Sequence, residues 1–298
     1  MIGAAGVAAA ALICLDPGHG TPPEIGRQRE PIGPRSKVLK IKDGGGARGE
    51  AAVALAIAKR TRAVLLARGY RVAMTRTGPT IHLPNGDGNI ARAKFCNRRH
   101  AALMVRIHAD GSADRSLQGV STLVPAWYRG WTDDIYARSR TAGFALQSKV
   151  VAATGAADRG IVKRSDLTGF NWANVPVALV ETGFLSNRHD SRLLHTATYQ
   201  RKVARGLADG VEAYIKRPPR RAYSSPPRIC SAAARPRSCT ASRRSATSPA
   251  SAWSTGVSAA SNSSRSSTSG RDSSSFRRSS SARGSGAGSG AGCRRSAR

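Results

Sequence analysis

The stretch LICLDPGHG, residues 12–20, joins an apolar run of strand length to a tight turn. Leu12–Leu15 has the composition of a buried strand, and the following DPG is a turn sequence. The turn presents His19 directly after the strand. Because ligands in open α/β sheets bind beyond the carboxyl ends of the strands, His19 is a candidate ligand-binding residue. A lone histidine in a turn is more often an ordinary polar residue, so its partners must come from elsewhere in the chain.

The composition of the 298-residue chain changes near residue 215. Up to Ile215, short apolar runs alternate with amphipathic segments, as in a folded domain. From Lys216 onward the chain consists mostly of Ser, Arg, Ala, Gly and Pro, and it cannot bury enough apolar surface to offset the entropy of ordering. We therefore expect one folded domain over residues 12–215 and a disordered tail over residues 216–298. The narrow amino-acid composition of this tail also fits an out-of-frame reading of a GC-rich gene.

The formal net charge of +31 is divided between these two parts. Residues 216–298 carry 17 lysines and arginines against one acid, a charge of +16, which leaves +15 for the rest of the chain. A basic surface suits nucleic-acid phosphates or an anionic matrix such as a bacterial cell wall. We identify no nucleic-acid-binding motif in the domain, so the charge alone identifies no partner.

The five cysteines are too few and too scattered to predict a disulfide framework. Cys14 falls in a predicted strand and Cys96 in a predicted helix, where each is expected to be a small buried residue. No C-x-x-C pair indicates a cysteine zinc site, and no run is long enough to span a bilayer. The Ala-rich opening, residues 1–11, is either the remnant of an export signal or the lead-in to the first strand.

Predicted strands and helices alternate along the folded part. Apolar runs predict strands over residues 12–15, 70–76, 102–110, 119–126 and 175–183. Apolar residues at helical spacing predict helices over residues 50–67, 90–100, 139–153 and a last segment that includes residues 199–214. This alternation predicts an α/β domain with a mostly parallel, twisted sheet of about five or six strands flanked by helices.

Four polar residues occupy comparable places in this pattern. His19, His108 and Glu181 each come at the end of a predicted strand, and Glu50 opens a helix. If the strands run parallel, these side chains emerge at one edge of the sheet. Two imidazoles and a carboxylate there, with a second carboxylate nearby, match a catalytic zinc site with three protein ligands and an open position. Each residue alone has a structural explanation, although a carboxylate that ends a buried strand needs a partner or a function.

The remaining histidines do not fit this pattern. They lie in polar loops or on a basic helix, and we expect them to be solvated: His82, His100, His189 and His195.

Four blocks of the sequence, in order, resemble one family: LDPGHG, GEAAVALAIAKRTRAVLLARGYRVAMTR, RIHAD and VPVALVETGFLSN. They resemble the zinc-dependent N-acetylmuramoyl-L-alanine amidases of the amidase-3 type, which are peptidoglycan hydrolases. The resemblance covers about residues 12–215. It implies that His19, Glu50 and His108 bind one zinc ion and that Glu181 is the catalytic glutamate. It also implies peptidoglycan as the partner and a location in the cell wall or secreted, outside the cytoplasm.

The chain departs from the family pattern in its first loop and in its tail. The loop between His19 and Glu50 is long and basic, and it leaves Glu24 and Glu30 as rival carboxylate ligands. Glu50 is preferred because it opens the helix in the family's register. The tail resembles no family segment that we recognise.

The resemblance implies hydrolysis of the amide between the lactyl group of N-acetylmuramic acid and L-alanine of the stem peptide. Zinc would polarise the carbonyl, and Glu181 would accept the proton of the attacking water and return it to the departing nitrogen. Asp110, beside His108, is the next candidate for the base. The segment RSDLTGFNWANVP supplies three candidates for substrate contact: Asp166, Asn171 and Trp172.

Two other function classes also fit the sequence. In the first, the chain is a basic protein that binds cell wall or nucleic acid and whose site is vestigial. In the second, it is a zinc amidase that acts on another amide. A binder without a working site would purify without stoichiometric metal, and its binding would weaken steeply with salt. We expect no specific nucleic acid and no membrane span, and the cationic tail favours binding to anionic wall polymers.

Overall fold

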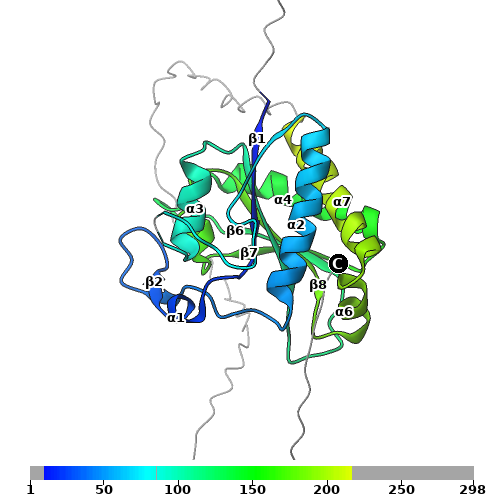
Figure 1. The fold of residues 1–298 in the computed structure, drawn as a ribbon. Helices are drawn as coiled ribbons and strands as arrows, with labels where there is room; N and C mark the ends of the chain where they lie inside the picture. The colour runs from blue at the N-terminus through cyan, green and yellow to red at the C-terminus, as the bar shows by residue number, and fades with distance from the viewer. Residues whose placement is uncertain (1–9, 85, 217–298) are drawn as a thin grey trace, which may run out of the picture. The chain divides into compact units, whose positions relative to one another are not determined.

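A six-stranded sheet organises residues 10–84 and 86–216, the part of the chain that the computed structural model describes (Figure 1). Its strands lie in the order β4-β1-β5-β8-β6-β7. Neighbouring strands run parallel, except that β6 and β8 are antiparallel. The predicted α/β fold with a mostly parallel sheet is therefore confirmed. The strand bounds are β1 Leu12–Pro17, β4 Arg71–Met74, β5 Leu103–Asp110, β6 Val120–Pro125, β7 Asp158–Arg164 and β8 Val177–Phe184.

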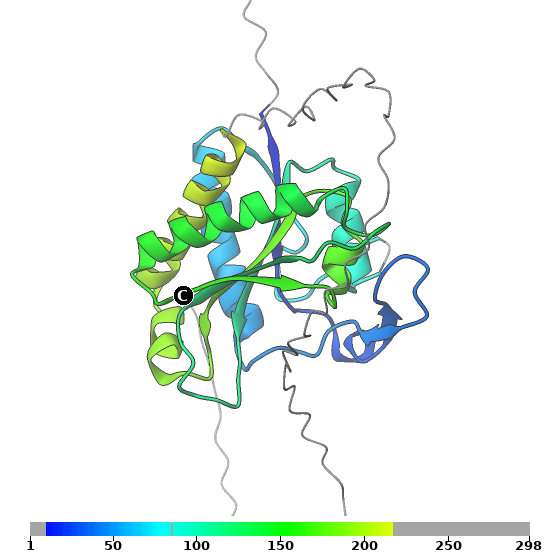
Figure 2. The same cartoon turned by 180° about the vertical axis from the view of Figure 1, so that it is seen from behind.

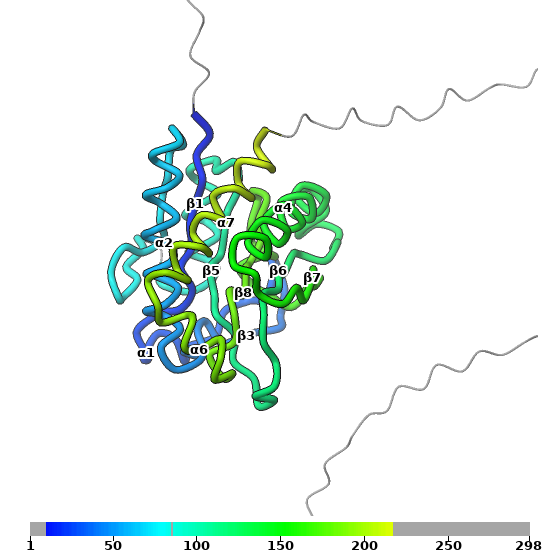
Figure 3. Tube along the Cα trace, turned by 90° about the vertical axis from the view of Figure 1, so that its right-hand side faces the viewer, coloured from blue at the N-terminus to red at the C-terminus, as the bar shows by residue number. Residues whose placement is uncertain are grey.

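Three long helices lie side by side over one face of the sheet (Figure 3). They are α2 Glu50–Ala67, α4 Tyr136–Thr154 and α7 Ala197–Ile215. The shorter helices α3 Asn89–Asn97 and α5 Thr168–Asn171 pack together over the other face. The view from behind shows α4 crossing the strands (Figure 2).

Alternating side chains of the central strands pack into two hydrophobic cores, one on each face of the sheet. Ile13 and Leu15 of β1 pack in the core beneath the long helices, whereas Cys14 between them belongs to the core on the α3 and α5 side. Successive residues of a strand point to opposite faces, and a parallel strand covered on both faces is apolar throughout. This explains why the predicted strands are apolar runs rather than alternating patterns.

Several small elements have no signal in the hydrophobic pattern. Strand β7 is an edge strand with a half-exposed sequence, DRGIVKR, so it lacks an apolar run. The first loop contains the short helix α1 Pro23–Gly26 and a two-stranded ladder of β2 Arg29–Pro31 with β3 Leu39–Ile41. Helix α6 Arg188–Leu194 precedes α7.

The structure describes only part of the two terminal segments for which the sequence makes predictions. Helix α7 ends at Ile215, where the predicted folded part ends. The predicted tail, residues 216–298, lies outside the described residues except for residue 216, as do residues 1–9 of the predicted export-signal remnant. Both stay predictions. None of the described helices combines the length and apolar composition needed to cross a bilayer.

A disulfide joins Cys14 of β1 to Cys96 of α3, with the two Cα atoms 5.7 Å apart. The sequence predicts two separate buried residues here. Their burial is confirmed, since both are 0% exposed, but the treatment of them as unpaired is wrong. The cysteines are 82 residues apart, so their spacing carries no signal, and the packing of α3 against the sheet brings them together. The bond ties the strand that leads into the DPGHG turn to a helix.

We predict that the disulfide stabilises the domain. Replacing Cys14 and Cys96 together by alanine should lower the free energy of unfolding by about 2–4 kcal/mol, the usual contribution of a native disulfide. Urea denaturation checks this value. Dithiothreitol should lower the urea midpoint of the unmodified protein and leave that of the double variant unchanged; a midpoint insensitive to dithiothreitol in both proteins would contradict the prediction.

Candidate metal centre

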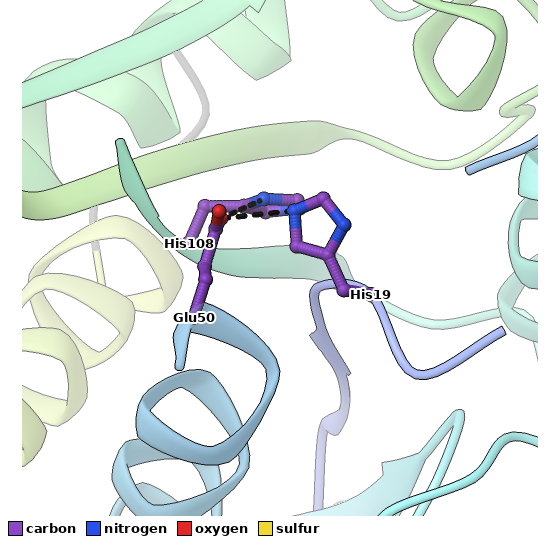
Figure 4. Close-up of side chains that lie close together, drawn as sticks. All are labelled: His19, Glu50 and His108. Atoms are coloured by element: carbon purple, nitrogen blue, oxygen red, sulfur yellow. Dashed lines mark hydrogen bonds and ion pairs between the residues drawn. The ribbon is translucent and has the colours of Figure 1, made fainter. Parts of the chain in front are cut away.

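His19, Glu50 and His108 converge at one edge of the sheet (Figure 4). His19 follows β1, Glu50 is the first residue of α2, and His108 lies near the end of β5. His19 Nε2 is 3.0 Å and His108 Nδ1 is 2.9 Å from Glu50 Oε1. One nitrogen or oxygen atom from each residue lies within 4.8 Å of the others. The parallel order of β1 and β5, with α2 after the first loop, therefore assembles residues that are 31 and 58 positions apart.

Two glycines make room for the histidine rings. A Cβ atom at Gly18 would overlap the ring of His108, and one at Gly46 would overlap the ring of His19. Gly46 also has a positive φ of 68°, a conformation that residues with a side chain rarely adopt. His19 itself has a φ of 58°, so its backbone must be held in the left-handed region by its surroundings.

The carboxylate of Asp16 provides that support. Its Oδ1 accepts hydrogen bonds from Arg92 Nη1 (2.8 Å) and Thr75 Oγ1 (2.5 Å), and its Oδ2 accepts one from Arg106 Nε (2.8 Å). Burial raises the pKa of this carboxyl, but the two arginines and the hydroxyl outweigh burial and hold the pKa well below its usual value. Arg92 Nη2 also donates to the carbonyl of His19 (2.6 Å). The ion pair therefore fixes the backbone of a candidate ligand.

Arg76 holds the same turn from the β4 side. Its Nε donates to the carbonyl of Pro17 (3.1 Å), and its Nη2 donates to the carbonyls of Gly18 and Ala51 (2.7 Å each). Because Ala51 is the second residue of α2, Arg76 links the turn that carries His19 to the helix that begins with Glu50.

Asp43 is a hydrogen-bond partner of His19 that the sequence does not predict. Its Oδ1 lies 2.7 Å from His19 Nδ1, and its two oxygens accept hydrogen bonds from the backbone N–H groups of Thr21 and Gly45. A carboxylate at Nδ1 fixes the orientation of the ring, so that Nε2 points toward Glu50. The only sequence signal is an acid just before the glycine run GGG, within a loop rich in charged residues.

The protonation of the cluster follows from these contacts. Burial by itself lowers the pKa of His19, but the hydrogen bonds to Asp43 and Glu50 outweigh it and raise the pKa to about 9. Burial raises the pKa of Glu50, yet the hydrogen bonds to His108 and His19 hold it well below its usual value. For His108, burial prevails and lowers the pKa. An ionised carboxylate and a neutral imidazole are the forms that bind a metal ion, so Glu50 and His108 are ready to bind one, whereas His19 must first lose a proton.

These residues fit a single zinc ion. Two imidazoles and one carboxylate form the donor set of a catalytic zinc site, and Asp43 supplies the outer hydrogen bond that such a histidine ligand usually makes. His108 Nε2 is buried and has no hydrogen-bond partner within the described residues. The cluster is the only group of three or more potential ligands found in the part of the chain that the structure describes.

The two rival carboxylates lie elsewhere. Glu30 is buried and accepts hydrogen bonds from the backbone N–H groups of Asn89 and Ile90, where it stabilises the start of α3. Glu24 is exposed in the first turn of α1. Of the three candidates, only Glu50 belongs to the cluster.

Glu181 lies on β8 in register with His108 of the neighbouring β5. It is 8% exposed, and its Oε2 has no hydrogen-bond partner among the described residues. Burial, together with the carboxylates of Asp110 and Glu50, holds its pKa well above the usual value. Glu181 and the cluster line one cavity of about 480 Å³, with Asp110 also on its wall. A buried carboxyl without a partner, next to three potential metal ligands, is suited to proton transfer.

The three predicted substrate-contact residues have different surroundings. Asp166 pairs with Arg164 and Lys40 and lines a second cavity next to the cluster. The side-chain amide of Asn171 is buried and donates to the carbonyls of Ile32 (3.0 Å) and Ser165 (2.9 Å).

Trp172 is likewise occupied within the protein, since its Nε1 donates to the carbonyl of Pro31 (3.0 Å). Neither Trp172 nor Asn171 lines the two cavities at the cluster. Both side chains instead hold the β2–β3 hairpin against α5. The remaining histidines of the sequence are exposed, as predicted: His82, His100, His189 and His195.

The fold and the cluster together define an α/β domain with a candidate metal centre at the carboxyl ends of its parallel strands. Residues 13–213 match the family model described as N-acetylmuramoyl-L-alanine amidase. Since this match covers well over half of the chain, the chain belongs to this family of peptidoglycan hydrolases. The family resemblance seen in the four sequence blocks is confirmed.

Individual relatives agree with this assignment. The chain is 28% identical over 204 residues to the N-acetylmuramoyl-L-alanine amidase LytC of Bacillus subtilis (strain 168), a match that covers 68% of this chain but 35% of LytC. It is 27% identical over 241 residues to the N-acetylmuramoyl-L-alanine amidase AmiA of Escherichia coli (strain K12), covering 68% of this chain and 76% of AmiA. The chain therefore spans about a third of the length of one relative and three quarters of the other.

A solved structure shows the same architecture. The crystal structure of the N-acetylmuramyl-L-alanine amidase Ami1 from Mycobacterium smegmatis has a TM-score of 0.62 and 26% sequence identity to this chain. The match covers 70% of this chain and 98% of that protein.

We predict that Asp43 strengthens metal binding through His19. Asp43→Ala should weaken zinc affinity about 10–100-fold, the usual effect of removing an outer partner of a histidine ligand. Competition with a chromogenic chelator measures this affinity. Asp209→Ala, which removes a partly exposed acid that pairs with Arg68 on the helical side, is the matched control and should leave the affinity unchanged. Equal affinities of the Asp43 variant and the control would contradict the prediction.

Proposed function

We propose that this chain is a zinc-dependent N-acetylmuramoyl-L-alanine amidase. It cleaves the amide between the lactyl group of N-acetylmuramic acid and L-alanine of the stem peptide. The observation that carries this proposal is the His19–Glu50–His108 cluster with the unpartnered carboxyl of Glu181 beside it, in a domain of the amidase family. The names of the relatives supply the bond, and the geometry supplies the residues.

His19, Glu50 and His108 would hold the zinc ion, with Asp43 orienting His19. A zinc ion with an open position lowers the pKa of water and polarises a carbonyl group, which are the two requirements for hydrolysing an amide near neutral pH. The buried Asp16 ion pairs keep the His19 backbone in place while substrate enters and leaves.

Glu181 moves the proton. In its ionised form, which a neighbouring zinc ion would favour, the Glu181 carboxylate accepts a water proton as the water oxygen adds to the carbonyl carbon. The same carboxyl then donates this proton to the alanine nitrogen as the C–N bond breaks. The products are the carboxyl group of the lactyl moiety and the free amine of the peptide. Glu181 lines the cavity and its Oε2 has no hydrogen-bond partner within the described residues, so no neighbour there competes for that proton.

We also propose that the protein works outside the cytoplasm, in the cell wall or secreted. The Cys14–Cys96 disulfide supports this location, because such bonds persist in oxidising compartments and are rare in the cytosol. The predicted binding of the tail to anionic wall polymers rests on its charge of +16 alone.

A wall-binding or nucleic-acid-binding protein with a vestigial site is the alternative. Loss of function usually removes ligands or the base, whereas this chain retains all three cluster residues and the buried Glu181. This observation favours the enzyme.

Digestion of purified peptidoglycan by the zinc-loaded protein tests the proposal. Mass spectrometry should find free muramic-acid lactyl carboxyl groups and stem peptides that begin with L-alanine. Protein treated with a chelator should release neither product, and added zinc should restore both. Undigested peptidoglycan in the presence of stoichiometric zinc would contradict the proposed activity.

Glu181→Gln should separate proton transfer from metal binding. The amide keeps the shape of the side chain but cannot accept the proton, so turnover should fall roughly 10²–10⁴-fold, the usual contribution of a general base. Zinc content, measured by atomic absorption, should stay at one ion per chain. Glu212→Gln, on the outer helix α7, is the control and should keep full turnover. Near-normal turnover of the Glu181 variant would show that another group is the general base, and Asp110 would be the first candidate to test.

A further inference from the structure

A groove of about 510 Å³ lies between the last turns of α4 and the first part of α7, on the helical side of the sheet (Figure 3). It shares no lining residue with the two cavities at the cluster. Helix α7 begins shortly after β8 ends, so its first turns lie toward the edge of the sheet that carries the cluster. This groove, here called the basic groove, has four basic residues in its wall: Lys149, Arg201, Lys202 and Arg205.

The positive charge of the basic groove is not balanced within the described residues. All four basic side chains are exposed, and none of them forms an ion pair there. Helix α4 contains no acid, and the two acids of α7 are already engaged. Asp209 Oδ1 lies 2.6 Å from Arg68 Nη2, and Glu212 Oε2 lies 3.0 Å from Arg68 Nη1. Arg201 and Arg205 are moreover a like-charge pair at i, i+4 spacing, which destabilises an isolated helix. An anionic partner would offset this repulsion.

Close packing of α4 against α7 fixes the width of the basic groove. A Cβ atom at Gly206 would lie 2.8 Å from the carbonyl oxygen of Lys149. One at Gly210 would lie 2.7 Å from the Cα atom of Leu146. The two backbones can approach this closely only because both positions lack a side chain. The cations on the two walls are therefore carried by a fixed frame, and binding an anion requires little ordering of the backbone. Small side chains keep the space between the walls open: Ala152 and Ala153.

The lining of the basic groove suits a flexible chain of phosphates better than other polyanions. No aromatic residue lines it, so the bases of a single-stranded nucleic acid would find no surface on which to stack. Its apolar residues are alanines only, so a lipid bilayer would gain little apolar contact there. A polymer of phosphodiesters joined by small alcohol units needs only cations and hydrogen-bond donors. The four basic residues and the hydroxyl of Thr198 provide both.

We propose that the basic groove is a binding site for a phosphodiester polymer of the cell wall, separate from the cluster. The choice of a wall polymer rests on the proposed location outside the cytoplasm, whereas the site itself belongs to the folded domain and does not depend on the tail. Binding there would keep the edge that carries the cluster next to the wall. The effective concentration of wall substrate at the cluster would rise without any new contact to the bond that is cleaved.

The first test measures binding of the full chain to a synthetic oligomer of glycerol phosphate by calorimetry. Replacing all four basic residues of the groove by glutamine should weaken binding roughly 10–100-fold, because each exposed ion pair contributes about two- to threefold. It should also flatten the dependence of the affinity on salt. The control protein loses two lysines and two arginines at exposed positions elsewhere and should keep most of the affinity. Its substitutions are Lys37→Gln, Lys59→Gln, Arg62→Gln and Arg129→Gln.

A second test fills the basic groove without changing its charge. Ala152→Trp places a large side chain between the walls and should reproduce most of the loss of binding. Ala137→Trp adds the same bulk at an exposed position in the first turn of α4 and should bind the oligomer normally. Both proteins retain every charge of the chain, the tail included, so a difference between them reports on the groove alone.

Three outcomes would overturn the proposal: equal affinities of the groove variant and its charge control, normal binding by Ala152→Trp, or a larger loss on another polyanion. For the last, the same proteins are tested with phosphatidylglycerol vesicles and with duplex DNA, and a larger loss on either would assign the groove to a membrane or to nucleic acid. Binding is measured without catalysis, so the result stands whether or not the chain is an amidase. The groove lies apart from the cluster, so its variants should hydrolyse soluble muropeptides at the unmodified rate.

Discussion

The ion pairs of one buried carboxylate hold the functional edge of this domain together. Asp16 receives hydrogen bonds from Arg92 on α3 and from Arg106 on β5, and both arginines are buried with it. Breaking a buried pair leaves an uncompensated charge, which is far more costly than losing a surface ion pair. Arg92 also donates a hydrogen bond to the carbonyl of His19. The position of a candidate metal ligand is therefore coupled to the packing of α3 on the sheet, and the Cys14–Cys96 disulfide reinforces that packing.

The site itself works against stability, as functional sites often do. Glu181 is a buried carboxyl without a partner in the described residues, and its raised pKa means that ionising it in the folded protein is unfavourable. His19 adopts a backbone conformation that is unusual for a residue with a side chain. Two buried arginines, Arg92 and Arg106, share the carboxylate of Asp16. The hydrophobic core beneath the helices α2, α4 and α7 offsets these costs.

The comparisons place this chain within the amidase family, and the structure shows how its first loop is positioned beside the cluster. The first loop, which is long and basic in the sequence, folds back to supply Asp43 beside His19 and Lys40 beside Asp166. Two tryptophans anchor that loop through backbone carbonyls, Trp131 at Pro34 and Trp172 at Pro31. A loop without an apolar pattern can therefore be well positioned, because its anchors are contributed by distant segments.

The sequence by itself determined the fold class and the bounds of the helix over residues 50–67, and it placed His19 and His108 at the carboxyl ends of strands. These follow from local information, because hydrophobic periodicity marks an element and parallel strands end at one edge of the sheet. The choice of Glu50 over Glu24 and Glu30 came from the family resemblance. Only the tertiary structure decided that Cys14 pairs with Cys96, that Asp43 orients His19, and that the side chain of Asn171 is used inside the protein. Each of these depends on contacts between residues far apart in the chain, and sequence spacing carries no record of which side chains come within hydrogen-bonding distance once the layers have packed.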